Sequence, residues 1–262
     1  MDKLLECKVV KIENGESSCI NELVVCEYPL TICLNGKKIA TLLCSPEKLK
    51  ELTLGFLRTE GIIESLEDIK YFKLDDVKAL VEAETFDKNV FRKSFYSKKV
   101  ELDNLKDNSL KEFKNFLQCI DCTPVVSKIT LKANKVLEFM KKNLDFSEIF
   151  KKTGGLHCVA LSDTEYIIII SEDVARHNAL DKVIGEGLLK KIFFKDKILI
   201  LSGRVSLEMI LKAAKLEIPV IISKSAPTSL SVALAKKLNI TLVGFVRGNK
   251  MNIYSGEERI IY

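Results

Sequence analysis

The sequence is poor in histidine and arginine. Only two of its 262 residues are histidines, His157 and His177, and only six of its 41 basic residues are arginines. Because lysine is the usual cation here, an arginine indicates a position that needs a planar guanidinium. Arg176, Arg204 and Arg247 each stand beside an expected helix or strand end, and three such groups suit an anionic, phosphate-bearing ligand. Salt bridges to neighbouring acids are the alternative.

Long apolar runs are also missing. No run approaches the ~18 residues that a membrane span needs. The stretch MDKLLECKVVKIENG has no apolar core of signal-peptide length. We therefore expect a cytoplasmic protein with no membrane partner. The net charge of +5 is typical of a lysine-rich solvated surface, and we expect no nucleic-acid partner.

The eight cysteines lack the spacing of a disulfide framework. Without an export signal, most of them are expected to be reduced. Cys26, Cys33 and Cys44 fall in apolar strand-like runs, where cysteine usually acts as a small hydrophobic residue. Cys119 and Cys122 instead form a C-x-x-C pair followed by Thr-Pro, which places them on a loop or at a helix end. This pair is the candidate reactive centre.

Residues 1–102 predict a strand-rich α+β subdomain around one helix. Two strand patterns flank Asn35-Gly36, the strongest short hairpin signal. Ser45-Pro46-Glu47 then predicts a helix start with Ser45 as the cap, and Gly61 predicts the stop. Further strands are expected over 69–74, 78–83 and 90–96.

Residues 132–262 predict an α/β/α domain with a mixed sheet, after an interdomain segment over 103–131. Apolar runs separated by helical patterns indicate a sheet covered on both faces. Right-handed crossovers bring the carboxyl ends of parallel strands to one edge, where open α/β sheets bind ligands. Helices are expected over 133–144, from 178, and over 207–216 and 230–238; strands over 158–161, 166–170, 198–201, 218–222, 241–246 and 251–254. Three polar loops follow strands at that edge: Ser202-Gly203-Arg204, residues 223–229 with Ser225 and Thr228, and residues 245–250.

The stretch 153–182 holds both histidines and a tight turn, Thr153-Gly154-Gly155. His157, Arg176, His177 and Asn178 are expected at strand ends or at a helix start. Backbone N–H groups lack partners at such positions and can bind anions. Structural histidines and ordinary turn chemistry are the alternatives.

Together these segments resemble the FdhD/NarQ family of formate dehydrogenase accessory sulfurtransferases. The resemblance rests on the order and spacing of EYPLTICLNG, LTLGFLRTEGII, the C-x-x-C, TGGLHCVAL, EDVARHNALDKVIG, LILSGRVS, SKSAPTSLSVALA and LVGFVRGNKMNIYS. It implies a cytidine-deaminase-like second domain and a homodimer. It also implies a sulfur carrier that takes sulfur from a cysteine desulfurase as a persulfide. The acceptor it implies is the molybdenum of the bis-molybdopterin guanine dinucleotide cofactor that formate dehydrogenase needs.

The resemblance assigns roles to particular residues. Cys119 is expected to carry the persulfide and Cys122 to assist. The cofactor, or a guanine nucleotide as its analogue, is expected on the three loops and on the turn with its histidines. The cofactor-binding residues are predicted to be Phe245, Val246, Arg247, Gly248, Asn249, Lys250, Thr153, Gly154, Gly155, His157, Arg176, His177, Asn178, Ser202, Gly203, Arg204, Ser225 and Thr228.

The C-x-x-C departs from the family pattern C-G-x-C-G. Both glycines are absent from Cys119-Ile120-Asp121-Cys122-Thr123, and Asp121 puts a negative charge beside both thiols, which disfavours the thiolate. A compensating cation must come from elsewhere, Lys128 or an arginine. The zinc signature of deaminases is also missing, since no H-x-E and no Pro-Cys-x-x-Cys occurs.

Other interpretations of the C-x-x-C stay open. The pair could bind zinc together with His157 and Cys158, form a thioredoxin-type redox pair, or be two buried thiols. The alternative function is a nucleotide-binding protein of deaminase fold with a structural or redox C-x-x-C. A pure interaction scaffold is a third class.

Overall fold

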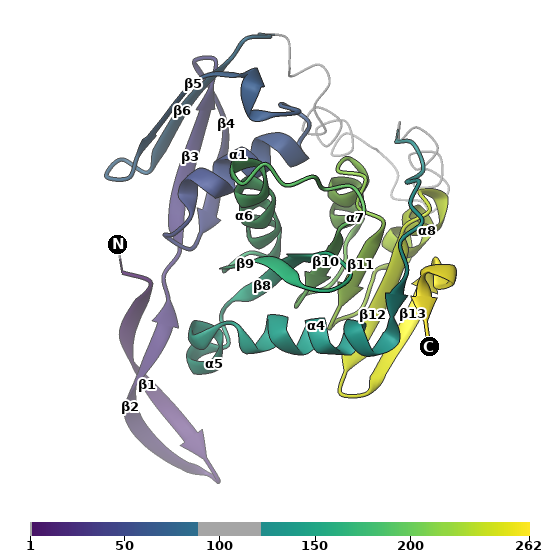
Figure 1. Ribbon diagram of the computed structural model, residues 1–262. Coiled ribbons are helices and arrows are strands. Elements are labelled where there is room, and N and C mark those ends of the chain that lie inside the picture. Colours follow the sequence, from purple (N-terminus) through teal and green to yellow (C-terminus); the bar gives the residue numbers. More distant parts are fainter. Residues whose placement is uncertain (1, 89–121) are drawn as a thin grey trace, which may run out of the picture.

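The computed structural model describes residues 2–88 and 122–262. The predicted strand over 90–96 and three members of the C-x-x-C segment, Cys119, Ile120 and Asp121, lie outside the described residues. The described chain forms a six-stranded sheet, a four-stranded sheet and two two-stranded sheets. Two packed helices, α1 and α6, lie between the two larger sheets (Figure 1).

The four-stranded sheet has the order β4-β3-β6-β5. Its first two strands form the predicted hairpin, because Asn35 and Gly36 have φ of 49° and 76°, the left-handed values that a two-residue turn requires. The elements of this part are β3 (Tyr28–Leu34), β4 (Lys37–Cys44), α1 (Leu49–Thr59), η1 (Leu66–Asp68), β5 (Ile69–Asp75) and β6 (Leu80–Thr85).

The predicted cap of α1 is wrong. The helix begins at Leu49, and its N-cap residue is Lys48, whose side chain makes no capping bond. Ser45 is used differently: its backbone N–H donates to Asp173 Oδ2 (3.0 Å), and its Oγ accepts from the Val174 N–H (3.2 Å). This serine therefore ties the N-terminal part of the chain to the large sheet. The predicted stop is confirmed, since α1 ends two residues before Gly61.

An N-terminal hairpin, which the sequence analysis missed, precedes this sheet. β1 (Leu4–Glu13) and β2 (Glu16–Val25) pair antiparallel over their whole length. Asn14 and Gly15 form the turn, with φ of 54° and 87°. The hairpin extends away from the rest of the chain (Figure 1).

The six-stranded sheet has the order β13-β12-β11-β10-β8-β9. β10, β11 and β12 are parallel, and the other neighbours are antiparallel, so the predicted mixed sheet is confirmed. Its strands are β8 (His157–Ser162), β9 (Ile167–Asp173), β10 (Ile198–Leu201), β11 (Val220–Ser223), β12 (Thr241–Arg247) and β13 (Lys250–Ser255). A small pair, β7 (Leu131–Lys132) and β14 (Ile260–Ile261), lies beside it.

Helices cover both faces of this sheet, which makes three layers. α4 (Ala133–Asp145) packs its apolar side on one face, through Val136, Phe139 and Met140. The other face is covered by α6 (Arg176–Leu189), α7 (Leu207–Ala214) and α8 (Ser229–Lys237). A short helix that was not predicted, α5 (Glu148–Thr153), leads into β8. The mixed α/β class is confirmed, while the specific likeness to cytidine deaminases stays a prediction.

The helices α1 and α6 touch backbone to backbone. A Cβ added to Gly55 would lie 1.7 Å from the Asp181 carbonyl oxygen, and one added to Gly185 would lie 1.8 Å from the Glu51 carbonyl oxygen. Only glycine allows this approach. The N-terminal part of the chain is therefore packed closely on the large sheet's helical layer.

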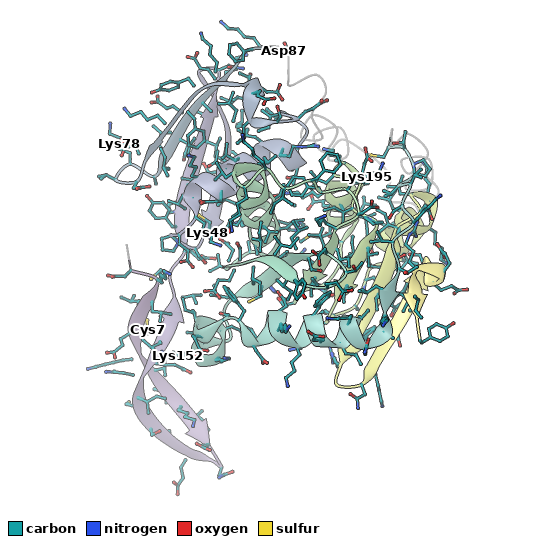
Figure 2. All side chains as sticks on the ribbon, in the orientation of Figure 1. Cys7, Lys48, Lys78, Asp87, Lys152 and Lys195 are labelled. Carbon is teal, nitrogen blue, oxygen red and sulfur yellow. The ribbon has the colours of Figure 1, made fainter. Side chains whose placement is uncertain are left out.

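Buried ion pairs surround this contact. Lys182 Nζ lies 2.7 Å from Asp173, with both side chains fully buried. Lys212 Nζ lies 2.7 Å from Asp181, which also accepts from Thr59 Oγ1 at 2.8 Å. At the other end of α1, Lys48 forms a partly exposed pair with Glu186 at 2.7 Å; Figure 2 labels this lysine at the junction. Removing one partner of either buried pair, Lys182–Asp173 or Lys212–Asp181, leaves an uncompensated charge, which costs about 3–5 kcal/mol.

Candidate functional site

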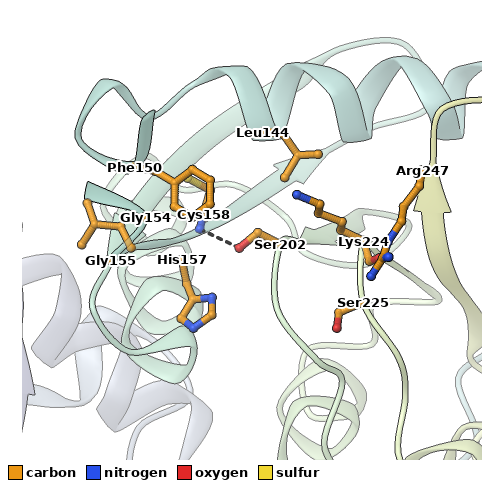
Figure 3. A pocket seen from close by; sticks show the side chains of 11 residues that line it. Leu144, Phe150, Gly154, Gly155, His157, Cys158, Ser202, Lys224, Ser225 and Arg247 are labelled. Carbon is orange, nitrogen blue, oxygen red and sulfur yellow. Dashed lines mark hydrogen bonds between the residues drawn. The ribbon is translucent and has the colours of Figure 1, made fainter. Parts of the chain in front are cut away.

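A cavity opens where β10, β11 and β12 end, which we call the carboxyl edge. Ser202 follows β10, Lys224 and Ser225 follow β11, and Arg247 ends β12. The cavity has a volume of about 330 Å³. Figure 3 shows Lys224 and Arg247 at one side of it and Phe150 and Gly154 at the other. Its remaining lining residues are Leu144, Gly155, Leu156, His157 and Cys158.

A second cavity of about 630 Å³ adjoins the first and shares Leu144, Lys224 and Arg247 with it. The two volumes fall in the range of small-molecule sites, about 300–1,000 Å³. Val246, Gly248 and Asn249 line the second cavity opposite α4. Four residues of the predicted segment 245–250 therefore border the paired cavities.

The other two residues of that segment, Phe245 and Lys250, are outside both linings. Phe245 has a left-handed backbone, with φ of 52°, and its N–H donates to the Ser225 carbonyl at 3.1 Å. Its ring lies 5.7 Å from the Arg247 guanidinium. Phe245 thus supports the arginine from outside the cavity.

The two cations of the cavity have no carboxylate partner within residues 2–88 and 122–262. Arg247 Nε donates to the Lys224 carbonyl at 3.2 Å, which fixes the guanidinium. Neither Arg247 nor Lys224 forms a salt bridge in the described part of the chain, although most of the salt bridges found there involve a lysine. Two cations that converge without acids favour a phosphate or another anion.

Hydrogen bonds hold the loops of the carboxyl edge together. Ser202 Oγ accepts from the Cys158 N–H at 3.0 Å, and the Ser202 N–H donates to the Cys158 carbonyl at 3.0 Å. Ser223 Oγ donates to the Gly203 carbonyl at 2.7 Å. Gly154 adopts φ of 68° as the C-cap of α5. The polar loops are therefore fixed by the strands that they follow.

His157 lines the first cavity, and its role in binding the cofactor stays a prediction. Its burial, and then the charge of Arg176, lower the pKa of His157, so the imidazole is neutral at pH 7. Gly203 packs between the two side chains, since an added Cβ would lie 3.2 Å from His157 Nδ1 and 3.5 Å from Arg176 Cδ. Arg176 Nε is buried and has no hydrogen-bond partner in the described part of the chain. This leaves an unused donor beside the cavity.

Several predicted residues lie outside both cavity linings. The His177 imidazole is 3.3 Å from the Glu208 carboxylate and connects α6 to α7. Asn178 donates to the Leu43 carbonyl at 2.7 Å and helps to join the two sheets. Thr228 caps α8 by accepting from Ser231 N.

Arg204 and Thr153 are also outside the linings. Arg204 is exposed and Thr153 is half-buried. The Thr153 hydroxyl donates to Ile149 O (2.8 Å) and accepts from Gly155 N (3.2 Å), closing the predicted turn.

Five residues that line the first cavity were not among the predicted cofactor-binding residues: Leu144, Phe150, Leu156, Cys158 and Lys224. Lys224 stands inside a loop that was selected for its serines, and a lysine-rich chain gives no reason to single out one lysine. Phe150 belongs to α5, whose signals were present, since Ser147 caps the helix and Gly154 ends it. Leu144 is the last residue of the helix predicted over 133–144, and no role was assigned to it.

The C-x-x-C pair is described only in part, because Cys119 is outside the described residues. Cys122 is half-buried and packs against the core beneath α6, α7 and α8. A cation accompanies it: burial lowers the pKa of Lys215 to about 8, while the charges of Glu60 and Cys122 act to raise it. Lys215 therefore supplies the positive charge near the thiol that the sequence required and that was expected from Lys128 or an arginine.

Cys122 and the cavities lie at opposite edges of the sheet. α7 leads from the carboxyl edge back to the start of β11, and Lys215 directly follows this helix. We call this the amino edge. β10 has four residues, which separates the edges by at least about 13 Å. The zinc site considered for Cys119, Cys122, His157 and Cys158 does not form among the described residues, because Cys122 lies at the amino edge whereas His157 and Cys158 line the carboxyl-edge cavity.

Cys158 behaves as a packing residue. Its side chain is buried, and this burial, with a contribution from Glu172, raises the pKa of Cys158 to about 12. The thiol is therefore protonated at neutral pH and is a weak nucleophile.

Comparisons with known proteins agree with this arrangement. The fold and the cavities define a mixed α/β protein whose pocket, at the carboxyl edge of the large sheet, suits an anion. The model of the FdhD/NarQ family matches residues 25–261, and the chain belongs to this family. Within the described residues no helix has the length and apolar character for crossing a membrane.

Individual relatives span nearly the whole chain. A protein named sulfur carrier protein FdhD from Bacillus pumilus is 41% identical over 247 residues, 94% of this chain and 93% of that protein. A protein of the same name from Staphylococcus aureus is 42% identical over 253 residues, 97% of this chain and 95% of that protein. A crystal structure described as that of a formate dehydrogenase accessory protein from Desulfotalea psychrophila has a TM-score of 0.78 and 26% identity, covering 99% of this chain and 100% of that one.

Proposed function

We propose that this chain is a sulfur carrier that serves formate dehydrogenase. It accepts sulfur from a cysteine desulfurase as a persulfide and transfers it to a bis-molybdopterin guanine dinucleotide molybdenum cofactor, acting as a sulfurtransferase. The observation that carries the proposal is the match to relatives named sulfur carriers at about 41% identity over 94% of the chain. The accessory protein with the same fold supports formate dehydrogenase as the enzyme served.

Cys119 carries the sulfur and Cys122 assists it. The Cys119 thiolate attacks the terminal sulfur of the donor's persulfide, forming a Cys119 persulfide and releasing the donor thiolate. As a resolving thiol, Cys122 then attacks the Cys119 sulfur. A Cys119–Cys122 disulfide forms, the terminal sulfur leaves as hydrosulfide, and the two thiols supply its two electrons. Lys215 beside Cys122 favours the thiolate form that this attack needs.

The paired cavities hold the cofactor as substrate. The donor set fits a phosphate-bearing ligand: Arg247 and Lys224 supply charge, Ser225 supplies a hydroxyl, and the buried Arg176 Nε is an unused donor beside the cavity. Gly248 lets the ligand approach the backbone, because nothing lies within 4 Å of an added Cβ. A guanine nucleotide is the analogue that tests this site.

Sulfur transfer has to connect the thiol pair with the cofactor cavities, which lie at the other edge of the sheet. Reacting atoms must come within roughly 3–3.5 Å, whereas Cys122 and the cavities lie on opposite edges. Either the segment that carries Cys119 crosses to the cofactor of its own subunit, which we favour, or a second subunit of a homodimer provides the cavity. Of the two histidines we favour His157 as the one that meets the sulfur, because it lines the first cavity. His177 is held by Glu208 outside both linings, which supports a bracing role.

The experiment is incubation with a cysteine desulfurase and sulfur-labelled cysteine in a buffer at cytoplasmic pH without added thiol reductant. A sulfur carrier acquires label on Cys119 or Cys122 that thiols remove. A nucleotide-binding protein of deaminase fold, the alternative, binds guanosine diphosphate without acquiring label. An interaction scaffold shows neither label nor nucleotide binding.

A further inference from the structure

The hairpin β1–β2 exposes apolar side chains over most of its length. Leu5, Val10 and Ile12 are 58%, 64% and 74% exposed, and Ile20 and Val24 are 36% and 37% exposed. The hairpin stands apart from the two larger sheets in Figure 2, which labels Cys7 on it. The register places Leu5, Ile20 and Val24 on one face of the hairpin and Val10 and Ile12 on the other. Both faces of this extended arm therefore expose apolar side chains, which is typical of an interaction surface.

The hairpin has little support from its own chain. Its base is anchored where Val25 packs against Gly155, at 2.8 Å from an added Cβ, and where Lys3 pairs with Glu47. Beyond the base, β1 pairs only with β2 in the described part of the chain, so its other edge is open. An isolated two-stranded hairpin is marginally stable, and an open edge is a template for another strand.

The hairpin register decides which backbone groups point outward. The Cys26 N–H donates to the Lys3 carbonyl, and the two-residue turn closes on the pair Glu13 and Glu16. Hydrogen-bonded pairs alternate in an antiparallel ladder, so the odd-numbered residues of β1 bond to β2. The peptide groups of Leu4, Glu6, Lys8 and Val10 therefore point to the open edge.

We propose that the open edge of β1 pairs antiparallel with β1 of a second copy of this chain, with Cys7 on the two-fold axis. Glu6 then faces Lys8 of the second copy in hydrogen-bonded pairs. Leu5 faces Val9, and Leu4 faces Val10. The result is a four-stranded sheet, which exceeds the three strands needed for independent stability.

Neighbouring registers are worse. If the axis passes through residue 6, Glu6 faces Glu6 of the second copy, and if it passes through residue 8, Lys8 faces Lys8 of the second copy. Like charges directly opposite each other are unfavourable. At the ends of the proposed register Lys3 meets Lys11. Both are already neutralised, Lys3 by Glu47 and Lys11 by Glu13 at 2.7 Å. Charge and apolar pairing together therefore select the register centred on Cys7.

The register makes a chemical prediction. Cys7 and its symmetry mate form a non-hydrogen-bonded pair, with Cα atoms about 4.5 Å apart. This separation lies within the range of disulfides, roughly 4.4–6.8 Å. Added oxidant, such as copper phenanthroline with oxygen, should remove two electrons and two protons from the two thiols and cross-link the chains. Cys19, exposed on the same hairpin but opposite Val10, is the matched control.

The first test is cross-linking of full-length protein at low micromolar concentration. Cys19→Ser should cross-link as the unchanged chain does, and Cys7→Ser should lose the cross-linked dimer. Cross-linking that survives Cys7→Ser would overturn the register. The inference rests on the proposed homodimer and does not depend on sulfur transfer.

The second test is a charge exchange, followed by sedimentation under reducing conditions. Glu6→Lys and Lys8→Glu should each weaken the dimer roughly tenfold, because two equivalent pairs become repulsive. The double variant Glu6→Lys/Lys8→Glu should restore it. Within the hairpin Glu6 faces Leu23 and Lys8 faces Asn21, so the exchange leaves the fold of one chain intact.

The outcomes separate three ideas. A chain that stays monomeric overturns both the interface and the homodimer. A dimer that ignores both single charge changes, or that the exchange does not restore, overturns the interface and leaves the homodimer standing. Sulfur loading by the desulfurase is measured separately and is untouched by either result.

Discussion

The two edges of the six-stranded sheet use their charges in opposite ways. At the carboxyl edge, Arg247 and Lys224 face cavities and form no salt bridge in the described part of the chain. At the amino edge, Lys212 is consumed by Asp181 at 2.7 Å, and Lys215 donates to the Thr59 carbonyl at 2.8 Å. The cations of the carboxyl edge are therefore available to a ligand, whereas the lysines of the amino edge bind groups of the chain around α1.

Under the proposed function, this difference assigns ligand binding to the carboxyl edge and thiol chemistry to the amino edge. The amino edge is rigid, because α1 contacts α6 through Gly55 and Gly185 and ends beside Lys215. A half-buried thiol beside a lysine suits a nucleophile, whereas an open cavity with two cations suits a phosphate-bearing cofactor. The following variants test whether the two edges can be disabled independently.

The largest effect is expected at the thiols. Cys119→Ser should abolish the maturation of formate dehydrogenase, because no persulfide can form, while folding and guanosine diphosphate binding persist. Cys158→Ala should retain most of the activity, since its thiol is buried and protonated. Formate dehydrogenase activity in cells that carry each variant is the measurement. Full maturation with Cys119→Ser would remove this cysteine from the mechanism.

The helix contact comes next. Gly185→Ala should destabilise the fold by about 3 kcal/mol, because its Cβ would overlap the Glu51 carbonyl and overpacking of this kind is expensive. Gly187→Ala on the same helix is the control. Its Cβ would meet the edge of the Phe194 ring, which can shift, so the loss should be smaller. Equal urea midpoints for the two variants would mean that α1 and α6 are not in backbone contact.

At the carboxyl edge, Arg247→Ala should weaken guanosine diphosphate binding by roughly 1.5–3 kcal/mol, the cost of a lost charged hydrogen bond. Arg204→Ala is the matched control, because this exposed arginine follows β10 but lines neither cavity. Calorimetric titration gives both affinities. If only Arg204→Ala weakens binding, the nucleotide lies at Ser202-Gly203-Arg204 instead.

A smaller effect is expected from the lysine beside the thiol. Lys215→Met should slow alkylation of Cys122 at pH 7 roughly two- to fivefold, because a nearby cation stabilises the thiolate. Lys128→Met should leave the rate unchanged. Since the pKa of Lys215 is lowered to about 8, mainly by burial, the difference should shrink above pH 8 as this lysine loses its charge. An equal rate for Lys215→Met and the unchanged chain at pH 7 would exclude the lysine's role.

The smallest effect concerns acid stability. Burial and Arg176 lower the pKa of His157 below its ordinary 6.5, so the unfolded chain binds more protons just below that pH. The free energy of unfolding should therefore fall as the pH drops through 6.5. His157→Gln should flatten this dependence in urea unfolding between pH 5 and 7. An unchanged slope would show that His157 does not titrate differently in the folded protein.

Much of this arrangement could be predicted from the sequence, because local signals coincided with tertiary ones. Asn35-Gly36 fixed one hairpin, and β10, an apolar run with short polar flanks, was predicted with its observed bounds. The loops of the carboxyl edge followed from the crossover rule. Ser45 was misassigned because its hydrogen-bond partners lie near residue 173, far away in sequence.

Other features could be recognised only in the three-dimensional structure. The Asn14-Gly15 turn was a signal of the same kind as Asn35-Gly36, but the charged, weakly alternating strands around it hid the N-terminal hairpin. The pairing of Cys122 with Lys215 joins residues 93 positions apart, from a loop and a helix end. The sequence also could not tell that His177 and Thr228 are engaged by Glu208 and by α8, since both stand at the predicted edge.

The division between the two edges is tested most directly by mass spectrometry of the peptide that contains Cys119 and Cys122. The protein would be incubated with a cysteine desulfurase and cysteine, with and without saturating guanosine diphosphate. We predict one added sulfur atom on this peptide in both samples, removed by thiols, because Cys122 lies at the edge of the sheet opposite to the cavities. A peptide that gains no sulfur while the nucleotide still binds would contradict the account.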